Sequence, residues 1–176
     1  MDKPTVTINT DGITDEQKAT AKFQSAYQDM LCQLTAPGFI PVLCAHEAAH
    51  VIYFAAAGTQ NFQPLPATIY YDATIDDYAG HLAAVQILDT PPFVEGKFWE
   101  QLAMLARAHA AGGVVARKLR PSSDGGDQDD KDRFKLMCEM FSADPNFSID
   151  VEEYWKKAQD SVVDDLENPE WLEISA

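Results

Sequence analysis

Residues 42–57 read VLCAHEAAHVIYFAAA and carry the strongest pattern in this chain. The stretch contains neither Gly nor Pro, and Pro41, directly before it, suits the first turn of a helix. Its only strongly polar residues are His46, Glu47 and His50. A helix that is apolar on nearly every side is normally buried, and buried polar groups are costly unless they find an ion or hydrogen bonds. The stretch therefore predicts a buried helix that contains a polar site.

These three polar residues match the pattern His-Glu-x-x-His. Residues four apart on a helix lie on the same face, so the imidazoles of His46 and His50 can reach one metal ion. Zn²⁺ accepts imidazole nitrogens at about 2.0–2.1 Å, and a catalytic zinc site leaves one position open for water. Glu47, beside the first histidine, can take a proton from that water. The sequence predicts His46 and His50 as zinc ligands and Glu47 as general base.

The composition is that of a globular protein of about one domain. The chain has 176 residues, and 46% of them are hydrophobic. Its 28 acidic and 13 basic residues give a net charge of −15, which opposes binding to nucleic acid or to anionic lipid surfaces. The three cysteines lie far apart and outside any CxxC pattern, which indicates a reducing compartment rather than a disulfide framework: Cys32, Cys44 and Cys138.

Two features of the sequence predict a cytoplasmic location. The N-terminus lacks the apolar segment of a signal peptide. A membrane-spanning helix needs roughly 18 or more apolar residues in a row, and no uninterrupted run in this chain approaches that length. We therefore expect no membrane span.

The remaining patterns predict a mainly α fold of the α+β class. Residues 1–13 are polar and irregular. Residues 67–71, rich in β-branched and aromatic side chains, and residues 80–85 predict two strands of a small antiparallel sheet beside the metal-binding helix. The helical spacing of apolar residues predicts four more helices, over about residues 14–34, 92–119, 127–144 and 150–166.

Two of these elements offer further candidate site residues. An exposed strand carrying Ile69, Tyr70 and Tyr71 can bind an extended peptide substrate by β-strand addition, although a strand that only covers the core has the same pattern. The helix predicted from residue 127 starts with several aspartates. Carboxylates favour the positive end of a helix dipole, and the same place suits a third metal ligand.

The order of these elements resembles the peptidase domain of FtsH-type AAA+ zinc proteases. That family carries HEAGH on a helix, then a β segment near the substrate and a helix reading like GGRAAE. A Gly-containing loop followed by Asn-Asp then supplies an aspartate as third zinc ligand. Here residues 112–117, reading GGVVAR, are similar to the second helix, and residues 126–130, reading GDQDD, are similar to the loop.

The resemblance covers about residues 40–170 and implies a helical, zincin-like single domain over residues 14–176. It implies that zinc is bound by His46, His50 and Asp130. It also implies an endopeptidase that hydrolyses peptides or unfolded protein segments with zinc-activated water.

The chain departs from the family pattern in several places. Ala49 replaces the Gly inside the motif, and Arg117 replaces the family's Glu. The chain has no Walker-type GxxxxGK[ST] motif, so the resemblance implies a peptidase without its own unfoldase, working alone on flexible substrates or with a separate ATPase or other protein partner. Other aspartates of the same stretch compete with Asp130 for the third-ligand role, with Asp127 as second choice: Asp127, Asp129 and Asp132.

Two alternatives to a peptidase share these residues. The first is a catalytically inactive module of the same fold that binds metal or peptide and acts with partner proteins; such a module has no need of Glu47. The second is a ferritin-like di-iron protein, because Glu47 and His50 also form a Glu-x-x-His pair. No other Glu in the chain is followed three residues later by His, which disfavours the di-iron site.

Overall fold

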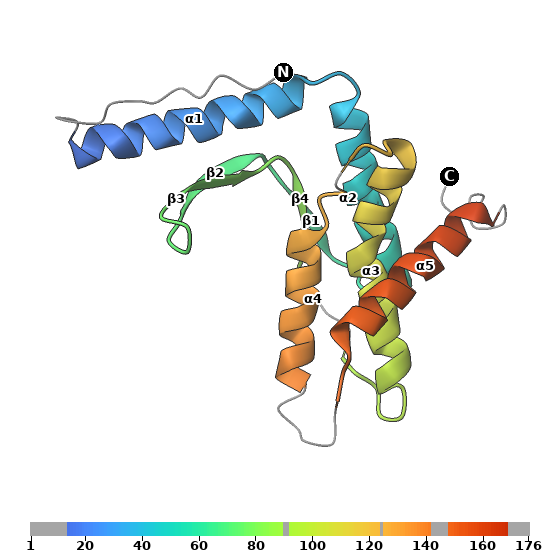
Figure 1. Cartoon of the computed structure of the whole chain (residues 1–176). Helices are drawn as coiled ribbons and strands as arrows, with labels where there is room; N and C mark the ends of the chain where they lie inside the picture. Colours follow the sequence, from blue (N-terminus) through green and yellow to red (C-terminus); the bar gives the residue numbers. More distant parts are fainter. Residues whose placement is uncertain (1–13, 90–91, 124, 142–147, 169–176) are drawn as a thin grey trace. The chain divides into compact units, whose positions relative to one another are not determined.

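The structure is a computed structural model that describes residues 14–89, 92–123, 125–141 and 148–168. In these ranges the chain forms five α-helices and four short β-strands, and the strands pair in two antiparallel sheets of two strands each (Figure 1). The expected mainly α fold with a small β component is therefore confirmed. The irregular segment expected at residues 1–13 lies outside the described residues.

The described chain packs as two compact units. The first, here called the hairpin unit, consists of the residues up to Thr35 together with Ala67–Leu82. The second, the helical unit, consists of Ala36–Pro66 and of the residues from Ala83 onward. The expectation of a single domain over residues 14–176 stays a prediction.

The hairpin unit combines one helix with one β-hairpin. Helix α1 (Asp15–Thr35) follows Thr14, whose hydroxyl accepts the backbone N–H of Gln17 at 3.2 Å, while the Gln17 side chain accepts the N–H of Thr14 at 2.8 Å. This reciprocal pair is a capping box and explains why the helix begins there. Strands β2 (Thr68–Asp72) and β3 (Asp77–His81) pair antiparallel, and α1 packs against both.

The helical unit is built around α3 (Phe98–Leu119). This helix packs against α2 (Phe39–Ala56), α4 (Gln128–Phe141) and α5 (Val151–Glu167). Figure 1 shows α3 between its neighbours, with α5 crossing it. Helix α5 begins where Asp150 accepts the N–H of Glu153 at 3.0 Å, which confirms the helix start expected near residue 150.

Two buried apolar clusters meet on α3. Its small side chains let neighbouring helices approach closely, so one helix can serve both clusters. The first cluster joins α3 to α2 and α5 through Ala49, Tyr53, Phe54, Leu105, Ala108, Ala111, Val114 and Val162. The second joins α3 to α4 and α5 through Leu102, Ala106, Ala110, Phe134, Cys138, Trp155 and Ala158.

Helix α2 buries one face only, and the expectation of a helix buried all round is wrong. Its buried residues follow the i, i+3, i+4, i+7 spacing of an amphipathic contact, although the rest of the helix is apolar as well. Half of its exposed positions are alanine, which loses little when it is exposed; the exposed residues of α2 are Ile40, Pro41, Cys44, Ala48, Ala55 and Ala56. The buried residues of α2 are His46, Ala49, His50, Tyr53 and Phe54.

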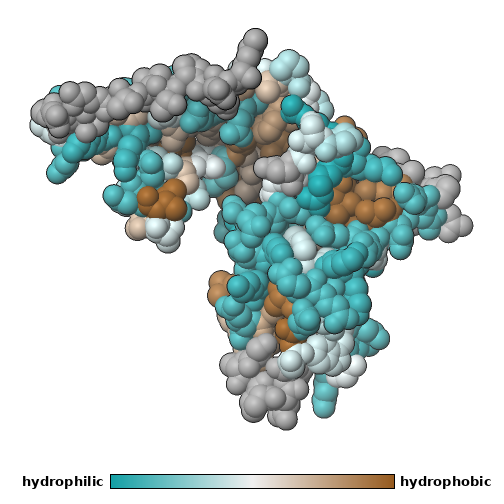
Figure 2. Space-filling view, viewed as in Figure 1, coloured by the Kyte–Doolittle hydropathy of each residue, from teal (hydrophilic) through white to brown (hydrophobic). Residues whose placement is uncertain are grey.

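Helix α2 is also long and apolar enough to cross a membrane, judged by length and composition alone. Core helices of other proteins meet the same criterion, and α2 does contribute buried residues to a core. Much of the described surface in view is hydrophilic (Figure 2), in line with the net charge of −15. The expected absence of a membrane span stays a prediction.

Two predicted boundaries differ from the structure. The helix expected from about residue 92 begins at Phe98, because Val94 and Lys97 close a turn through a 3.0 Å backbone hydrogen bond. The strand expected over residues 80–85 is divided between β3 and β4 (Ala84–Ile87). The β4 strand pairs with β1 (Phe62–Leu65). Pro66 lies between β1 and β2, and because proline has no backbone N–H it cannot donate a hydrogen bond to a neighbouring strand.

The core position of Phe134 gives a test of this packing. Phe134 is fully buried, so Phe134→Ala is expected to lower the free energy of unfolding by about 3–5 kcal/mol, measured by urea denaturation. Leu136→Ala is the matched control, because Leu136 lies on the same helix and is 60% exposed. It is expected to change the free energy by less than about 0.5 kcal/mol. Equal losses of unfolding free energy in the two variants would contradict the burial of Phe134 and the exposure of Leu136 on α4.

Candidate metal centre

The buried face of α2 presents two imidazoles side by side. His46 and His50 are one helical turn apart, and both are buried. Their Nε2 atoms lie 3.0 Å from each other. A contact this short between two imidazole nitrogens requires a shared proton or an ion that both lone pairs can face.

The tautomer of His50 is set by its other ring nitrogen. Nδ1 of His50 lies 2.8 Å from the carbonyl oxygen of Ala108 on α3. A carbonyl only accepts, so Nδ1 carries the hydrogen and the Nε2 lone pair of the neutral ring points into the site. Metal-binding histidines are oriented in this way by a carbonyl on the outer nitrogen.

The third group of the site is Asp130, in the first turn of α4. Its Oδ2 lies 3.2 Å from Nε2 of His50 and 3.8 Å from Nε2 of His46. Burial alone would raise the pKa of Asp130, but the surrounding histidines His109, His46 and His50 hold it well below its usual range. The carboxylate of Asp130 is therefore ionised and available as a metal ligand.

The same contacts act on the pKa of His50. Burial lowers this pKa, but the Asp130 carboxylate and the Ala108 carbonyl outweigh burial and raise it above its ordinary value. A bound cation would take the place of that proton, since metal binding and protonation compete for the same lone pair.

These three groups fit a metal ion. Among the described residues, His46, His50 and Asp130 form a group whose ligand atoms all lie within 4.8 Å of one another. Ligands in a tetrahedral site with bonds of about 2.0–2.1 Å are separated by about 3.3 Å. The separations of 3.0, 3.2 and 3.8 Å bracket that value. The donor set, two imidazoles and one carboxylate, is common to catalytic zinc and non-haem iron(II) sites.

Space for an ion beside the histidines depends on Gly112 of α3. A methyl group at this position would lie 2.5 Å from Nε2 of His50 and 2.6 Å from Nε2 of His46, closer than side chains approach in proteins. A methyl group at Gly113 would lie 2.4 Å from Oδ2 of Asp127. In the sequence the Gly-Gly pair stands out only through the resemblance; the structure shows that Gly112 leaves space beside the two histidines and Gly113 leaves space for Asp127.

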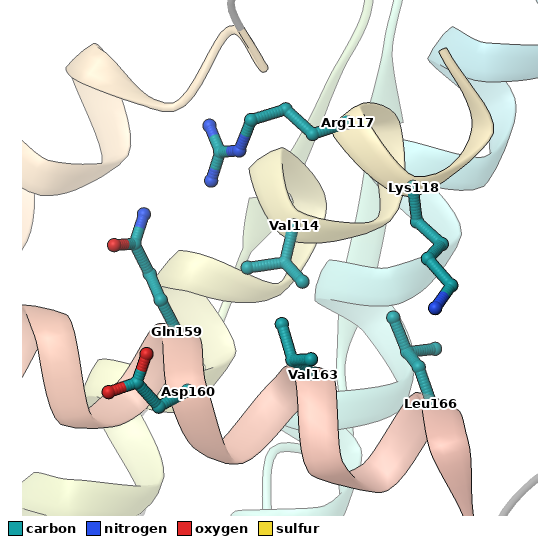
Figure 3. Close-up of a pocket in the computed structure, with 7 residues that line it drawn as sticks. All are labelled: Val114, Arg117, Lys118, Gln159, Asp160, Val163 and Leu166. Carbon is teal, nitrogen blue, oxygen red and sulfur yellow. The ribbon is translucent and has the colours of Figure 1, made fainter. Parts of the chain in front are cut away.

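Asp127, the second choice for the third ligand, occupies a different place. Its carboxylate pairs with Arg117 at 3.0 Å and accepts a hydrogen bond from the Gln159 side chain at 3.3 Å. Figure 3 shows Arg117 on α3 and Gln159 on α5 extending toward the same region, beside a cavity of about 370 Å³. Asp127 therefore ties the start of α4 to α3 and α5, and so helps to place Asp130.

The other two competing aspartates are exposed. Asp129 and Asp132 lie on the outer side of α4, and Asp132 accepts a hydrogen bond from the Gln128 side chain at 3.0 Å. The loop before the helix contains Gly125 and Gly126 with φ of +91° and +65°, values that favour glycine. This loop geometry lets α4 start where its first turn faces the histidines.

Glu47 lies beside the two histidines and next to strand β4. The backbone of Val85 on this strand faces its carboxylate and acts to lower its pKa. Burial raises the pKa of Glu47 above its ordinary value, although the nearby His46 and His50 act in the opposite direction. A carboxylate with a raised pKa is a better proton acceptor near neutral pH.

The register of β4 explains why Val85 reaches Glu47. The N–H of Leu88 donates to the carbonyl of Asn61 at 3.0 Å, so these two residues form a hydrogen-bonded pair. Pairs alternate along an antiparallel ladder, which makes Pro64 and Val85 a non-hydrogen-bonded pair. Pro64, without an N–H, fits that position. The N–H and C=O of Val85 therefore point away from β1 and toward the site.

The substrate-binding candidates of the sequence lie in the other unit. Ile69, Tyr70 and Tyr71 belong to β2 of the hairpin unit, where Tyr70 and Tyr71 are exposed. Their role in binding a peptide stays a prediction. Sequence reasoning missed Val85 as a site residue, because a backbone group leaves no signal in residue identity.

Comparison with known proteins leaves the resemblance untested. No protein-family model matches this chain, and no curated protein or solved structure matches it. Likeness to FtsH-type peptidases therefore stays a prediction from the motifs.

The geometry at Gly112 predicts the effect of adding one methyl group. Gly112→Ala would ordinarily favour the helix by up to about 1 kcal/mol. The methyl group displaces both imidazoles, however, so zinc affinity is expected to fall by more than about 100-fold, the upper end for changes that act from outside the ligand set. Competition with a chromophoric chelator measures this affinity. Ala103→Ser, which adds one heavy atom to a partly exposed position of the same helix, is expected to bind zinc normally. Full zinc affinity in folded Gly112→Ala protein would contradict the close approach of Gly112 to the imidazoles of His46 and His50.

Proposed function

We propose that this protein is a zinc-dependent endopeptidase that hydrolyses peptides or unfolded protein segments. The observation that carries the proposal is the convergence of two imidazoles and one carboxylate, from His46, His50 and Asp130, next to Glu47. Three protein ligands and one open position are the arrangement of catalytic zinc sites. The His-Glu-x-x-His spacing on α2 favours zinc over other divalent ions.

Each residue has a defined part in the proposed hydrolysis. Zinc, when bound by His46, His50 and Asp130, supplies an activated water and polarises the scissile carbonyl. The Glu47 carboxylate accepts the proton of that water and then passes it to the leaving amine. The Ala108 carbonyl keeps His50 in the tautomer that binds metal.

The outward edge of β4 supports an extended peptide as the substrate. Val85 directs its N–H and C=O toward the site, and β4 pairs with no second strand in the described part of the chain. An extended peptide binds such an edge through main-chain hydrogen bonds, which depend little on its side chains. A peptide on this edge lies beside Glu47, where its scissile bond is within reach.

The alternative is an inactive module of the same fold that binds metal or peptide together with partner proteins. The raised pKa of Glu47 and its place beside the histidines favour catalysis, because a module that only binds has no use for a proton acceptor there. Separate partners, such as an ATPase that unfolds substrates, are compatible with either function.

The role of Glu47 predicts the effect of Glu47→Gln. The amide cannot accept the proton, so cleavage of casein and of fluorogenic peptides is expected to fall by about 10²–10⁴-fold, with zinc content unchanged. Glu139→Gln on the exposed side of α4 is the matched control and is expected to keep full activity. Cleavage that persists in pure Glu47→Gln protein would contradict the assigned role.

The metal bound by the wild-type protein is a separate test. Iron in place of zinc in protein purified without added metal would favour iron(II) chemistry instead.

The role of the β4 edge predicts the effect of Val85→Pro. Proline removes the outward N–H but no β1–β4 hydrogen bond, so cleavage of peptides is expected to fall by about 5–10-fold, as for the loss of one or two hydrogen bonds. Zinc affinity is expected to stay unchanged. Val85→Thr keeps the N–H and the β-branch, and serves as control. Unchanged kcat/KM in Val85→Pro would exclude this edge as the peptide site.

A further inference from the structure

His109 is a partly buried histidine beside the metal centre that the proposed hydrolysis does not use. It lies on α3, and its Nδ1 is 4.0 Å from Oδ1 of Asp130. In the described part of the chain this Nδ1 has no hydrogen-bond partner, and it is shielded from solvent. A buried polar atom without a partner costs about 1–3 kcal/mol. The unpartnered Nδ1 of His109 beside Asp130 therefore calls for an explanation.

The His109 ring is held by two aromatic side chains. Phe54 of α2 packs edge-on against it, with ring centroids 5.0 Å apart and an interplanar angle of 86°. Phe134 of α4 packs on it with centroids 6.3 Å apart. These contacts orient the ring so that Nδ1 faces the Asp130 carboxylate. The sequence alone favours a packed or surface histidine at position 109 over a metal ligand.

The two oxygens of Asp130 face different partners. Oδ2 lies near the Nε2 atoms of His50 and His46, at 3.2 and 3.8 Å, whereas Oδ1 faces His109. A carboxylate that binds a metal through one oxygen is usually held by a hydrogen-bond donor on the other. The Nδ1 atom of His109 lies on the side of Asp130 where such a donor is expected.

We propose that His109 is a positioning residue for the metal centre. Its Nδ1–H donates to Oδ1 of Asp130 when the site holds a divalent cation, and this keeps Oδ2 directed at the ion. Closing the gap to the usual distance of about 3 Å takes a movement of about 1 Å, which a rotation of the carboxylate provides. The inference rests on the proposed zinc site and adds to it a residue that sets metal affinity without touching the metal.

Two variants test the Nδ1–H donor and the aromatic ring of His109 separately. His109→Phe keeps an aromatic ring between Phe54 and Phe134 but removes the donor, so zinc affinity is expected to fall on the order of 10–100-fold. His109→Asn places an amide N–H near the position of Nδ1 and is expected to recover most of that affinity. His109→Gln, whose amide reaches toward the Nε2 position, is a second variant without the donor, for use if His109→Phe does not fold. Zinc affinity is measured by chelator competition on the full chain.

The metal-free proteins provide the control for a purely structural role. His109→Phe replaces a partnerless polar atom by carbon, so its melting temperature in EDTA is expected to equal or exceed that of the wild type. A large fall in that temperature, with zinc affinity retained, would overturn the proposal in favour of a packing role.

The affinities distinguish the remaining outcomes. Wild-type affinity in both donor-free variants would overturn the role of His109 and leave the zinc site standing. A loss in His109→Asn as large as in His109→Phe would show that an N–H donor at this place does not set zinc affinity, and would overturn the positioning role. A wild-type protein that binds no zinc would overturn the proposed function itself, and the inference with it.

Discussion

The candidate site depends on how closely the backbone of α3 passes the side chains of α2. At Gly112 this distance leaves no room for a methyl group next to the two Nε2 atoms, and Gly113 gives the same clearance to Asp127. Because α3 comes so close, its Ala108 carbonyl reaches His50. The same helix carries His109 toward Asp130 and Arg117 toward Asp127. One helix thereby orients groups from α2 and from α4.

The electrostatics of the cluster agree with a divalent cation. Burial raises the pKa of Glu47, and the charge of Asp130 adds to that increase. Asp130 stays ionised because histidines surround it, and His50 responds with a raised pKa. Two partly buried carboxylates and two buried imidazoles lie together, and charges removed from water favour partners of opposite sign. A divalent cation balances both carboxylates and uses the lone pairs that protons otherwise occupy.

Much of the fold follows from local sequence, with instructive exceptions. The starts of α1 and α5 lie where the sequence predicts them, and at each start the cap involves only neighbours in the chain. Helix α3 starts later than its apolar spacing predicts, since a turn at Val94–Lys97 comes first. Helix α2 is apolar all round yet buries one face, because its neighbours α3 and β4 cover only that side. Periodicity shows which residues tolerate burial, whereas packing decides which are buried.

The sequence by itself determined that His46 and His50 share a helix face with Glu47 beside them, because residues four apart in a helix are neighbours whatever surrounds it. It pointed to Asp130 only through a resemblance, with Asp127 as a rival. Tertiary structure separated the two, since Asp130 meets the histidines and Asp127 meets Arg117. Tertiary structure alone brought Val85 and His109 to the site. Their contacts join segments far apart in the chain, and only the packing of α2, α3, α4 and β4 sets those distances.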